Sequence, residues 1–161
     1  ARKLGYRFLD TGLMYRAITW AAVEARIDPK DASKLERLAQ EQPMALLFQE
    51  DGNVTVLVGG KDVTPHLRDL KIEQAVSQVS QAAAVRDVLV AQQRRLAQEG
   101  GIVMAGRDIG TVVLPNASVK VFLTASFQER AWRRYAEMEA RGDNTTYEEV
   151  LADLQRRDKM D

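Results

Sequence analysis

The chain has 161 residues, of which 45% are hydrophobic and 29% are charged, and its 23 Lys and Arg balance its 23 Asp and Glu. A single globular domain of this size has a core that needs neither disulfides nor metals. The sequence has no Cys and one His, which excludes a thiolate nucleophile and metal sites built from Cys or several His. Zero net charge argues against nucleic-acid binding, and no apolar run approaches the ~20 residues that span a bilayer. We therefore expect a soluble, cytoplasmic protein that binds neither nucleic acid nor membranes.

The first and last residues have the patterns of interrupted elements. Arg2, Lys3 and then Gly5 form a typical helix end, but no residues precede them to begin that helix. The last predicted helix, 147–161, opens at Thr145 or Thr146 and reaches the final residue without a cap. We therefore expect further segments on both sides of this sequence.

In the first half of the chain, the spacing of apolar residues is first typical of helices and then, from about residue 45, typical of strands. A strand is predicted over 6–9, followed by the turn Asp10-Thr11-Gly12 and by helices over 13–26 and 32–39. Apolar runs at 45–48 and 54–58 then flank Asp51-Gly52-Asn53, which is a strong hairpin signal. We expect a small β insert within residues 42–82 of a domain that covers 1–161.

The second half alternates between helices and apolar strands. This alternation predicts an α/β fold with a parallel sheet flanked by helices. The predicted elements are helices over 72–80 and 85–98, strands over 102–105 and 119–123, and a helix over 127–140 capped by Ser126 and Glu129.

Two turns follow predicted parallel strands and are the first places to expect a ligand, because ligands of such sheets bind at the carboxyl ends of the strands. They are Asp10-Thr11-Gly12 and Gly106-Arg107-Asp108. Arginines near these turns suggest a phosphorylated ligand, since guanidinium groups bind phosphate oxygens bidentately. An arginine-rich helix face is, however, usually a solvated face. Gly59-Gly60 fits a hairpin turn better than a phosphate cradle, and His66 fits a solvated loop histidine better than a catalytic base.

Several strings of the sequence, in order, resemble the bacterial cytidylate kinase family from end to end. They are Leu9-Asp10-Thr11-Gly12-Leu13-Met14-Tyr15-Arg16, Val85-Arg86, Gly106-Arg107-Asp108-Ile109-Gly110-Thr111-Val112-Val113 and Val121-Phe122-Leu123-Thr124-Ala125-Ser126. The resemblance implies a P-loop-kinase-like fold with a nucleoside-monophosphate-binding β insert. It also implies a monomeric phosphotransferase that moves the γ-phosphoryl group of ATP, with Mg²⁺, to CMP or dCMP.

The resemblance assigns roles to individual residues. Thr11 matches a position that touches the base, and Arg86 and Asp108 match the pair that reads the cytosine edge. Without the resemblance, a surface arginine and a turn-capping carboxylate are the simpler interpretations of these two residues. The other implied contacts are Arg16 and Arg107 on the acceptor phosphate, Arg130 and Arg134 over the ATP phosphates, and Ser77, Arg157 and Asp161 near the ribose.

The sequence departs from the family pattern in one large feature. It contains no Gly-x-x-x-x-Gly-Lys-Ser/Thr string, the loop with which such kinases cradle ATP phosphates. The chain as given is therefore expected to carry the acceptor side of the site and to be a poor catalyst. A monophosphate-binding module without catalysis and a related kinase with another base preference are the alternatives.

Overall fold

The structure is a computed structural model that describes residues 1–160, including every side chain except those of Arg157, Lys159 and Met160. The chain divides into two compact units, Ala1–Ser118 and Val119–Asp161. Each unit has its own secondary structure and packing, and the six acceptor-side candidates that precede residue 119 all belong to the first.

A parallel pair of strands lies in the first unit. β1 (Arg7–Asp10) pairs with β5 (Ile102–Ala105), and the register places Asp10 opposite Ala105. The carboxyl ends of both strands therefore meet at one edge, so the turns that follow them become neighbours. The predicted parallel pairing is confirmed, with bounds close to those expected from the apolar runs.

The second sheet of this unit is antiparallel and built from local turns. It contains β2 (Met44–Phe48), β3 (Val54–Val58) and β4 (Lys61–Asp62), in that order. Between β2 and β3, Gly52 has a φ of 88°, and Asp51 Oδ1 accepts from the Asn53 amide at 2.8 Å. The hairpin predicted from Asp51-Gly52-Asn53 is confirmed, because its turn chemistry is decided by adjacent residues.

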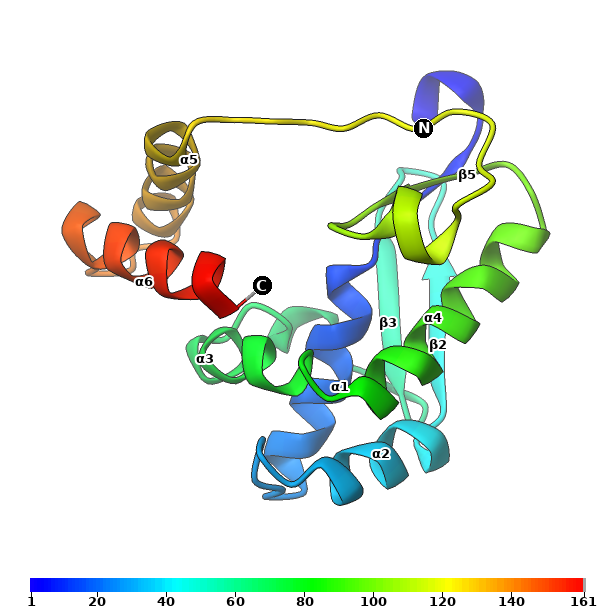
Figure 1. Cartoon of the computed structure of the whole chain (residues 1–161), viewed down its shortest axis with the longest axis horizontal. Coiled ribbons are helices and arrows are strands. Elements are labelled where there is room, and N and C mark those ends of the chain that lie inside the picture. Colours follow the sequence, from blue (N-terminus) through cyan, green and yellow to red (C-terminus); the bar gives the residue numbers. More distant parts are fainter. Residues whose placement is uncertain (161) are drawn as a thin grey trace. The chain divides into compact units, whose positions relative to one another are not determined.

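Four helices flank these strands, with α1 at the centre of the unit (Figure 1). α1 packs against α2 and α3, and α2 packs against α4. None of the helices in the described part of the chain is both long and apolar enough to cross a membrane. Their bounds are α1 (Gly12–Glu24), α2 (Ala32–Glu41), α3 (Leu70–Val79) and α4 (Ala83–Gln98), with short helical turns η1 (Arg2–Leu4), η2 (Thr64–His66) and η3 (Ile109–Val113).

α1 supplies side chains to two adjoining hydrophobic clusters. Met14 and Ile18 pack with Leu35 of α2 and Leu89 of α4, all within 1% of complete burial. The second cluster joins other side chains of α1 to the small sheet and α3, including Ala17, Trp20, Val56, Val63, Leu67 and Ile72. α1 and its preceding turn are therefore held from two sides.

The second unit consists of two capped helices. α5 (Phe127–Ala140) begins at Ser126, whose hydroxyl accepts from the Glu129 amide at 3.2 Å. α6 (Tyr147–Met160) begins with a reciprocal capping box: the Thr146 amide donates to Glu149, and the Glu149 amide donates to Thr146 Oγ1. Both predicted helix starts are confirmed.

The strand predicted over 119–123 is wrong. Val119, Val121, Phe122 and Leu123 are between 80% and 89% exposed, and the segment forms no ladder with any described strand. Its apolar residues have the intrinsic preference of a strand, but a strand also needs a hydrogen-bonded neighbour. Within the described chain, β1 and β5 pair with each other and with no third strand.

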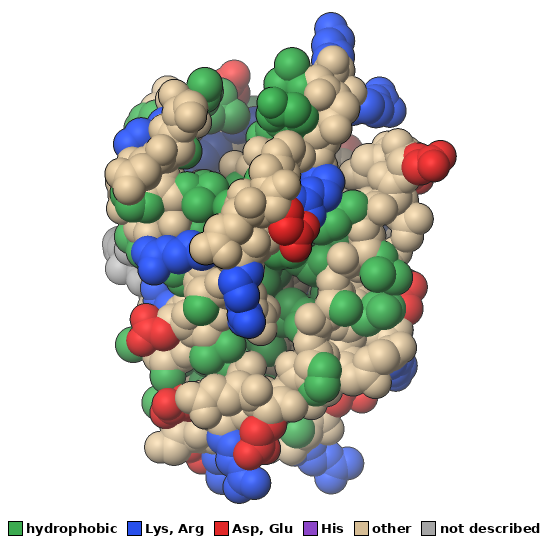
Figure 2. Space-filling model, turned by 90° about the vertical axis from the view of Figure 1, so that its right-hand side faces the viewer, with side chains coloured by type: hydrophobic (Ala, Val, Ile, Leu, Met, Phe, Trp, Pro, Cys, Tyr) green, Lys and Arg blue, Asp and Glu red, His purple; other side chains and the backbone are tan. Residues whose placement is uncertain are grey.

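Charged side chains of both signs are mixed on the face drawn in Figure 2. Lys and Arg side chains are scattered there among Asp and Glu side chains, with hydrophobic side chains between them. This distribution agrees with the equal numbers of basic and acidic residues in the sequence.

Leu89→Ala should lower the free energy of unfolding of this chain by about 2–5 kcal/mol, because Leu89 is fully buried and its removal leaves a cavity. Urea denaturation followed by circular dichroism measures the loss. Leu70→Ala is the control, since Leu70 is 64% exposed and should change stability by only about 0.5 kcal/mol. Equal losses in both variants would contradict the assigned core.

Candidate functional site

The two turns expected to bind a ligand lie against each other. The Thr11 amide and the Thr11 hydroxyl both donate to the carbonyl of Ala105, at 2.9 and 3.1 Å. Thr11 is only 4% exposed, and Asp10 Oδ1 accepts from the Gly12 amide at 3.0 Å, which caps the start of α1. The turn after β1 is thus fixed directly to the end of β5, where Gly106 begins the second turn.

Gly106 permits this close approach. A Cβ atom at residue 106 would lie 2.4 Å from Thr11 Oγ1 and 2.9 Å from the Ile109 side chain. Such distances are far inside van der Waals contact, so a larger residue would force the Thr11 and Ile109 side chains, or the turns that carry them, to shift. The spacing between Thr11 and the Arg107-Asp108 turn therefore depends on the absence of a side chain at 106.

Arg86 and Asp108 form an ion pair across this region. Nη2 of Arg86, in the first turns of α4, lies 2.5 Å from Oδ2 of Asp108. The two side chains are 40% and 26% exposed, so the pair remains open to a ligand. A guanidinium group has five donors and a carboxylate has two oxygens, so each partner keeps capacity for further hydrogen bonds.

The phenol of Tyr15, in α1, is affected by the charges of three predicted site residues. Burial raises the pKa of its phenol, and the negative charge of Asp108 acts in the same direction. The positive charges of Arg86 and Arg107 oppose that rise in pKa. Arg86, Arg107 and Asp108 therefore lie within electrostatic reach of the same hydroxyl.

Gln93 is a buried amide beside this phenol. Its side chain lowers the Tyr15 pKa, although less than the neighbouring charges do, and the residue is 1% exposed. Its Nε2 has no hydrogen bond of ordinary geometry to any residue that the structure describes. A buried N–H donor without a partner costs about 1–3 kcal/mol, so its retention here needs a reason.

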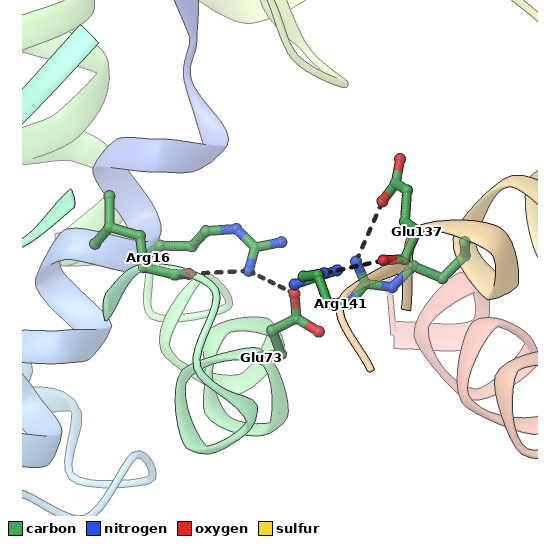
Figure 3. Close-up of polar contacts among 6 residues, drawn as sticks. Arg16, Glu73, Glu137 and Arg141 are labelled. Atoms are coloured by element: carbon green, nitrogen blue, oxygen red, sulfur yellow. Dashed lines mark hydrogen bonds and ion pairs between the residues drawn. The ribbon is translucent and has the colours of Figure 1, made fainter. Parts of the chain in front are cut away.

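Arg16 lies one residue after Tyr15 and its guanidinium is directed toward α3 (Figure 3). Nη1 of Arg16 lies 3.3 Å from the Leu67 carbonyl oxygen and 3.4 Å from Oε1 of Glu73, whose side chain is 6% exposed. Ser77 follows Glu73 by four residues in α3, so the two share a helix face. Arg16 and Ser77 are thereby associated with α3, whereas Arg86, Arg107 and Asp108 gather around Tyr15.

The two arginines expected to contact ATP, Arg130 and Arg134, each have a partner within the second unit. Arg130 forms a bidentate contact with Asp158, at 2.9 and 2.5 Å, and Arg134 lies 3.5 Å from Glu137. The side chain of Arg157 and all of Asp161 fall outside the described residues. Among the described residues there is no group of three His, Asp or Glu side chains that could hold a metal ion.

No role for Tyr15, Glu73, Gln93 or Arg94 was predicted from the sequence. Tyr15 stands inside one of the strings that carry the family resemblance, which was the available signal. Glu73 and Gln93 are charged or polar residues whose burial only the packing of α3 and α4 reveals. Arg94 forms two backbone contacts to the turn that contains Val112 and Val113.

A sequence model of the cytidylate kinase family matches residues 1–161. The chain belongs to this family. The cytidylate kinase of Mycolicibacterium paratuberculosis is 51% identical over 162 residues, which cover all of this chain and 71% of that protein. The Bacillus licheniformis cytidylate kinase is 45% identical, with the same coverage, and a Prochlorococcus marinus bifunctional pantoate ligase/cytidylate kinase is 42% identical over 31% of its length.

The predicted resemblance is thus confirmed over the whole chain. Cytidylate kinases are nucleoside-monophosphate kinases, phosphotransferases that move a phosphoryl group from ATP to CMP or dCMP. The parallel β1–β5 pair, its flanking helices and the small antiparallel sheet agree with the P-loop-kinase-like α/β fold expected for the family.

Gly106→Ala should destabilise the chain by about 1–3 kcal/mol, because the new methyl group overlaps Thr11 Oγ1 and the Ile109 side chain, so these groups must shift out of their packed positions. Thermal or urea denaturation measures this change. Combining Gly106→Ala with Thr11→Ala removes the nearest overlapping atom and should recover part of the loss, whereas Thr11→Ser retains the oxygen and should not. Wild-type stability of the single Gly106→Ala variant would contradict the close approach.

The phenol of Tyr15 should ionise above the ordinary tyrosine pKa of ~10, because burial disfavours its charged form. Ultraviolet difference titration should show this late transition in the wild type and lose it in Tyr15→Phe. Since the folded pKa is raised, the associated stability is complete below pH ~10 and is lost as the pH rises toward the folded value. Asp108→Asn should lower the Tyr15 pKa and Arg86→Gln should raise it. Identical titrations in all variants would contradict the charge cluster.

Proposed function

We propose that this chain forms the acceptor side of a cytidylate kinase site and binds CMP or dCMP through its first unit. The observation that carries the proposal is the Arg86–Asp108 pair at the carboxyl end of β5, beside Arg107 and Tyr15. It combines a carboxylate, a guanidinium and a further cation within one partly exposed region. A pyrimidine monophosphate requires these same groups.

The Arg86–Asp108 pair matches the hydrogen-bonding edge of cytosine. Cytosine presents an amino donor at C4 and acceptors at N3 and O2, so Asp108 accepts from the amine and Arg86 donates to the acceptors. Uracil reverses two of these groups, which places a carbonyl against Asp108 and an N–H against Arg86. Each mismatch leaves a polar group unpaired at a cost of about 1–3 kcal/mol. Thr11, at the adjoining turn, is proposed to contact the base from the other side.

Arg107 and Arg16 are proposed to bind the acceptor phosphate. Arg107 is exposed and follows Gly106 directly, while the Arg16 guanidinium is held by the Leu67 carbonyl and Glu73. Phosphoryl transfer requires in-line positioning and compensation of the charge that spreads over the transferred group. Arginines supply both without a proton-transferring side chain. Ser77, on the α3 face that bears Glu73, is assigned to the ribose.

ATP is the phosphoryl donor of the family, and we propose that Mg²⁺ enters the site with it, held chiefly by its phosphate oxygens. Arg130 and Arg134 of α5 are proposed to contact the ATP phosphates, and Arg157 and Asp161 the ribose of the acceptor. The Arg130–Asp158 pair shows that this guanidinium already accommodates two oxygens in bidentate geometry. We further propose that the protein acts as a monomer in the cytoplasm.

Isothermal titration of the 161-residue chain with CMP, cytidine and UMP tests the acceptor site. The wild type should bind CMP more tightly than UMP, and more tightly than cytidine because of the phosphate. Asp108→Ala should abolish the preference for CMP over UMP, whereas Arg107→Ala should reduce CMP binding toward that of cytidine while keeping the base preference. Asp87→Ala and Arg95→Ala, which change exposed charges on α4, are the matched controls.

Two results would contradict the assignment. Equal affinity for CMP and UMP in the wild type would favour a related kinase with another base preference. Indistinguishable losses in Asp108→Ala and Arg107→Ala would reject the division between base and phosphate recognition.

A further inference from the structure

Several amides of the turn that follows Asp108 donate hydrogen bonds to one backbone carbonyl oxygen. η3 begins directly after Asp108, and the amides of Thr111, Val112 and Val113 all donate to the Asp108 carbonyl oxygen, at 3.3, 2.8 and 3.2 Å. The position of Asp108 is consequently tied to the conformation of this turn. Any motion of η3 moves the carboxylate that pairs with Arg86.

Arg94 of α4 holds the other end of the same turn. Its Nε donates to the Val113 carbonyl oxygen at 3.1 Å, and its Nη2 donates to the Val112 carbonyl oxygen at 2.7 Å. Carbonyl groups at the end of a helical turn lack amide partners and carry partial negative charge. One edge of a guanidinium group therefore caps two adjacent carbonyls.

Arg86 and Arg94 connect α4 to both ends of this turn. They are eight residues apart, which corresponds to about 12 Å along the helix. Arg86 binds the Asp108 side chain at the start of the turn, and Arg94 binds the backbone at its end. The rigid helix thus sets the distance between the two attachment points, one of which is Asp108 itself.

We propose that Arg94 is a positioning residue for base recognition: it acts through η3 to hold Asp108 where it meets Arg86, without touching the nucleotide. This inference rests on the acceptor site proposed above. Arg94 is exposed and would otherwise resemble the solvated cations of the same helix. The proposal gives it an effect on the choice between cytosine and uracil.

The contact requires the planar fork of an arginine. Nε and Nη2 lie on one edge and address two carbonyls together, whereas the single nitrogen of a lysine side chain reaches one of them with the same charge. Arg95, the next residue, offers a matched control. It is exposed and forms no hydrogen bond or ion pair with the described residues.

The experiment compares Arg94→Ala, Arg94→Lys and Arg95→Ala in the full 161-residue chain. Amide hydrogen exchange without nucleotide measures the protection of residues 111–114. Titration with CMP, UMP and cytidine measures recognition. Arg94→Ala should accelerate exchange in the turn, weaken CMP and cytidine by the same factor of about ten, and reduce the CMP-to-UMP preference, because base contacts suffer and phosphate contacts do not. Arg94→Lys should be intermediate, and Arg95→Ala should match the wild type.

Three results would overturn the inference. One is faster exchange in Arg94→Ala with CMP affinity and base preference within about twofold of the wild type, which indicates a structural role alone. Another is amide exchange in Arg94→Ala that is the same as in the wild type. A third is equal effects of Arg94→Ala and Arg95→Ala, which indicate a general charge effect. Where Arg94→Ala does not fold, Arg94→Lys provides the same comparison. Failure of the wild type to bind CMP would instead reject the proposed function, and the exchange measurement distinguishes that case because it needs no nucleotide.

Discussion

The ion pair between Arg86 and Asp108 connects α4 to the turn that follows β5. The positions of the neighbouring site residues depend on this connection. A carboxylate held by a guanidinium has a fixed orientation, so the edge it presents to a ligand is already formed. The same pair contributes opposing effects to the Tyr15 pKa, which shows that α1 also reaches this point. Three elements distant in sequence thereby converge on a partly exposed set of charges.

Parallel pairing of β1 and β5 makes this convergence possible. Since the register sets Asp10 opposite Ala105, Thr11 and Gly106 emerge side by side, and the missing side chain at 106 lets them touch. α1 continues from the first turn, while α4 returns to the second through Arg86 and Arg94. Packing of Met14 and Ile18 with Leu89 joins these two helices below the site. α1 and α4 therefore contribute side chains both to the hydrophobic core and to the recognition surface.

Turns and helix ends, which depend on residues adjacent in the sequence, could be predicted from the sequence. The hairpin at Asp51-Gly52-Asn53 and the helix start at Ser126 depend on side chains that bond their own backbone. The exposed segment 119–123 shows the limit, because local preference does not supply a partner strand. For the site, strand-end position indicated Arg107 and Asp108, but only the family resemblance indicated Arg86. Glu73 and Gln93 required the packed structure, because nothing in the spacing of a helix reveals which polar side chain it buries.

Gln93 is a buried polar side chain whose Nε2 has no hydrogen bond of ordinary geometry among the described residues, so its burial costs stability. A leucine of similar size would remove the desolvation penalty and fill the same space, so selection for heat resistance alone would favour it. It would also remove the amide contact that lowers the Tyr15 pKa, so that pKa would rise further. Cytidylate kinases adapted to hot environments would then face opposing pressures at a single buried amide beside Tyr15.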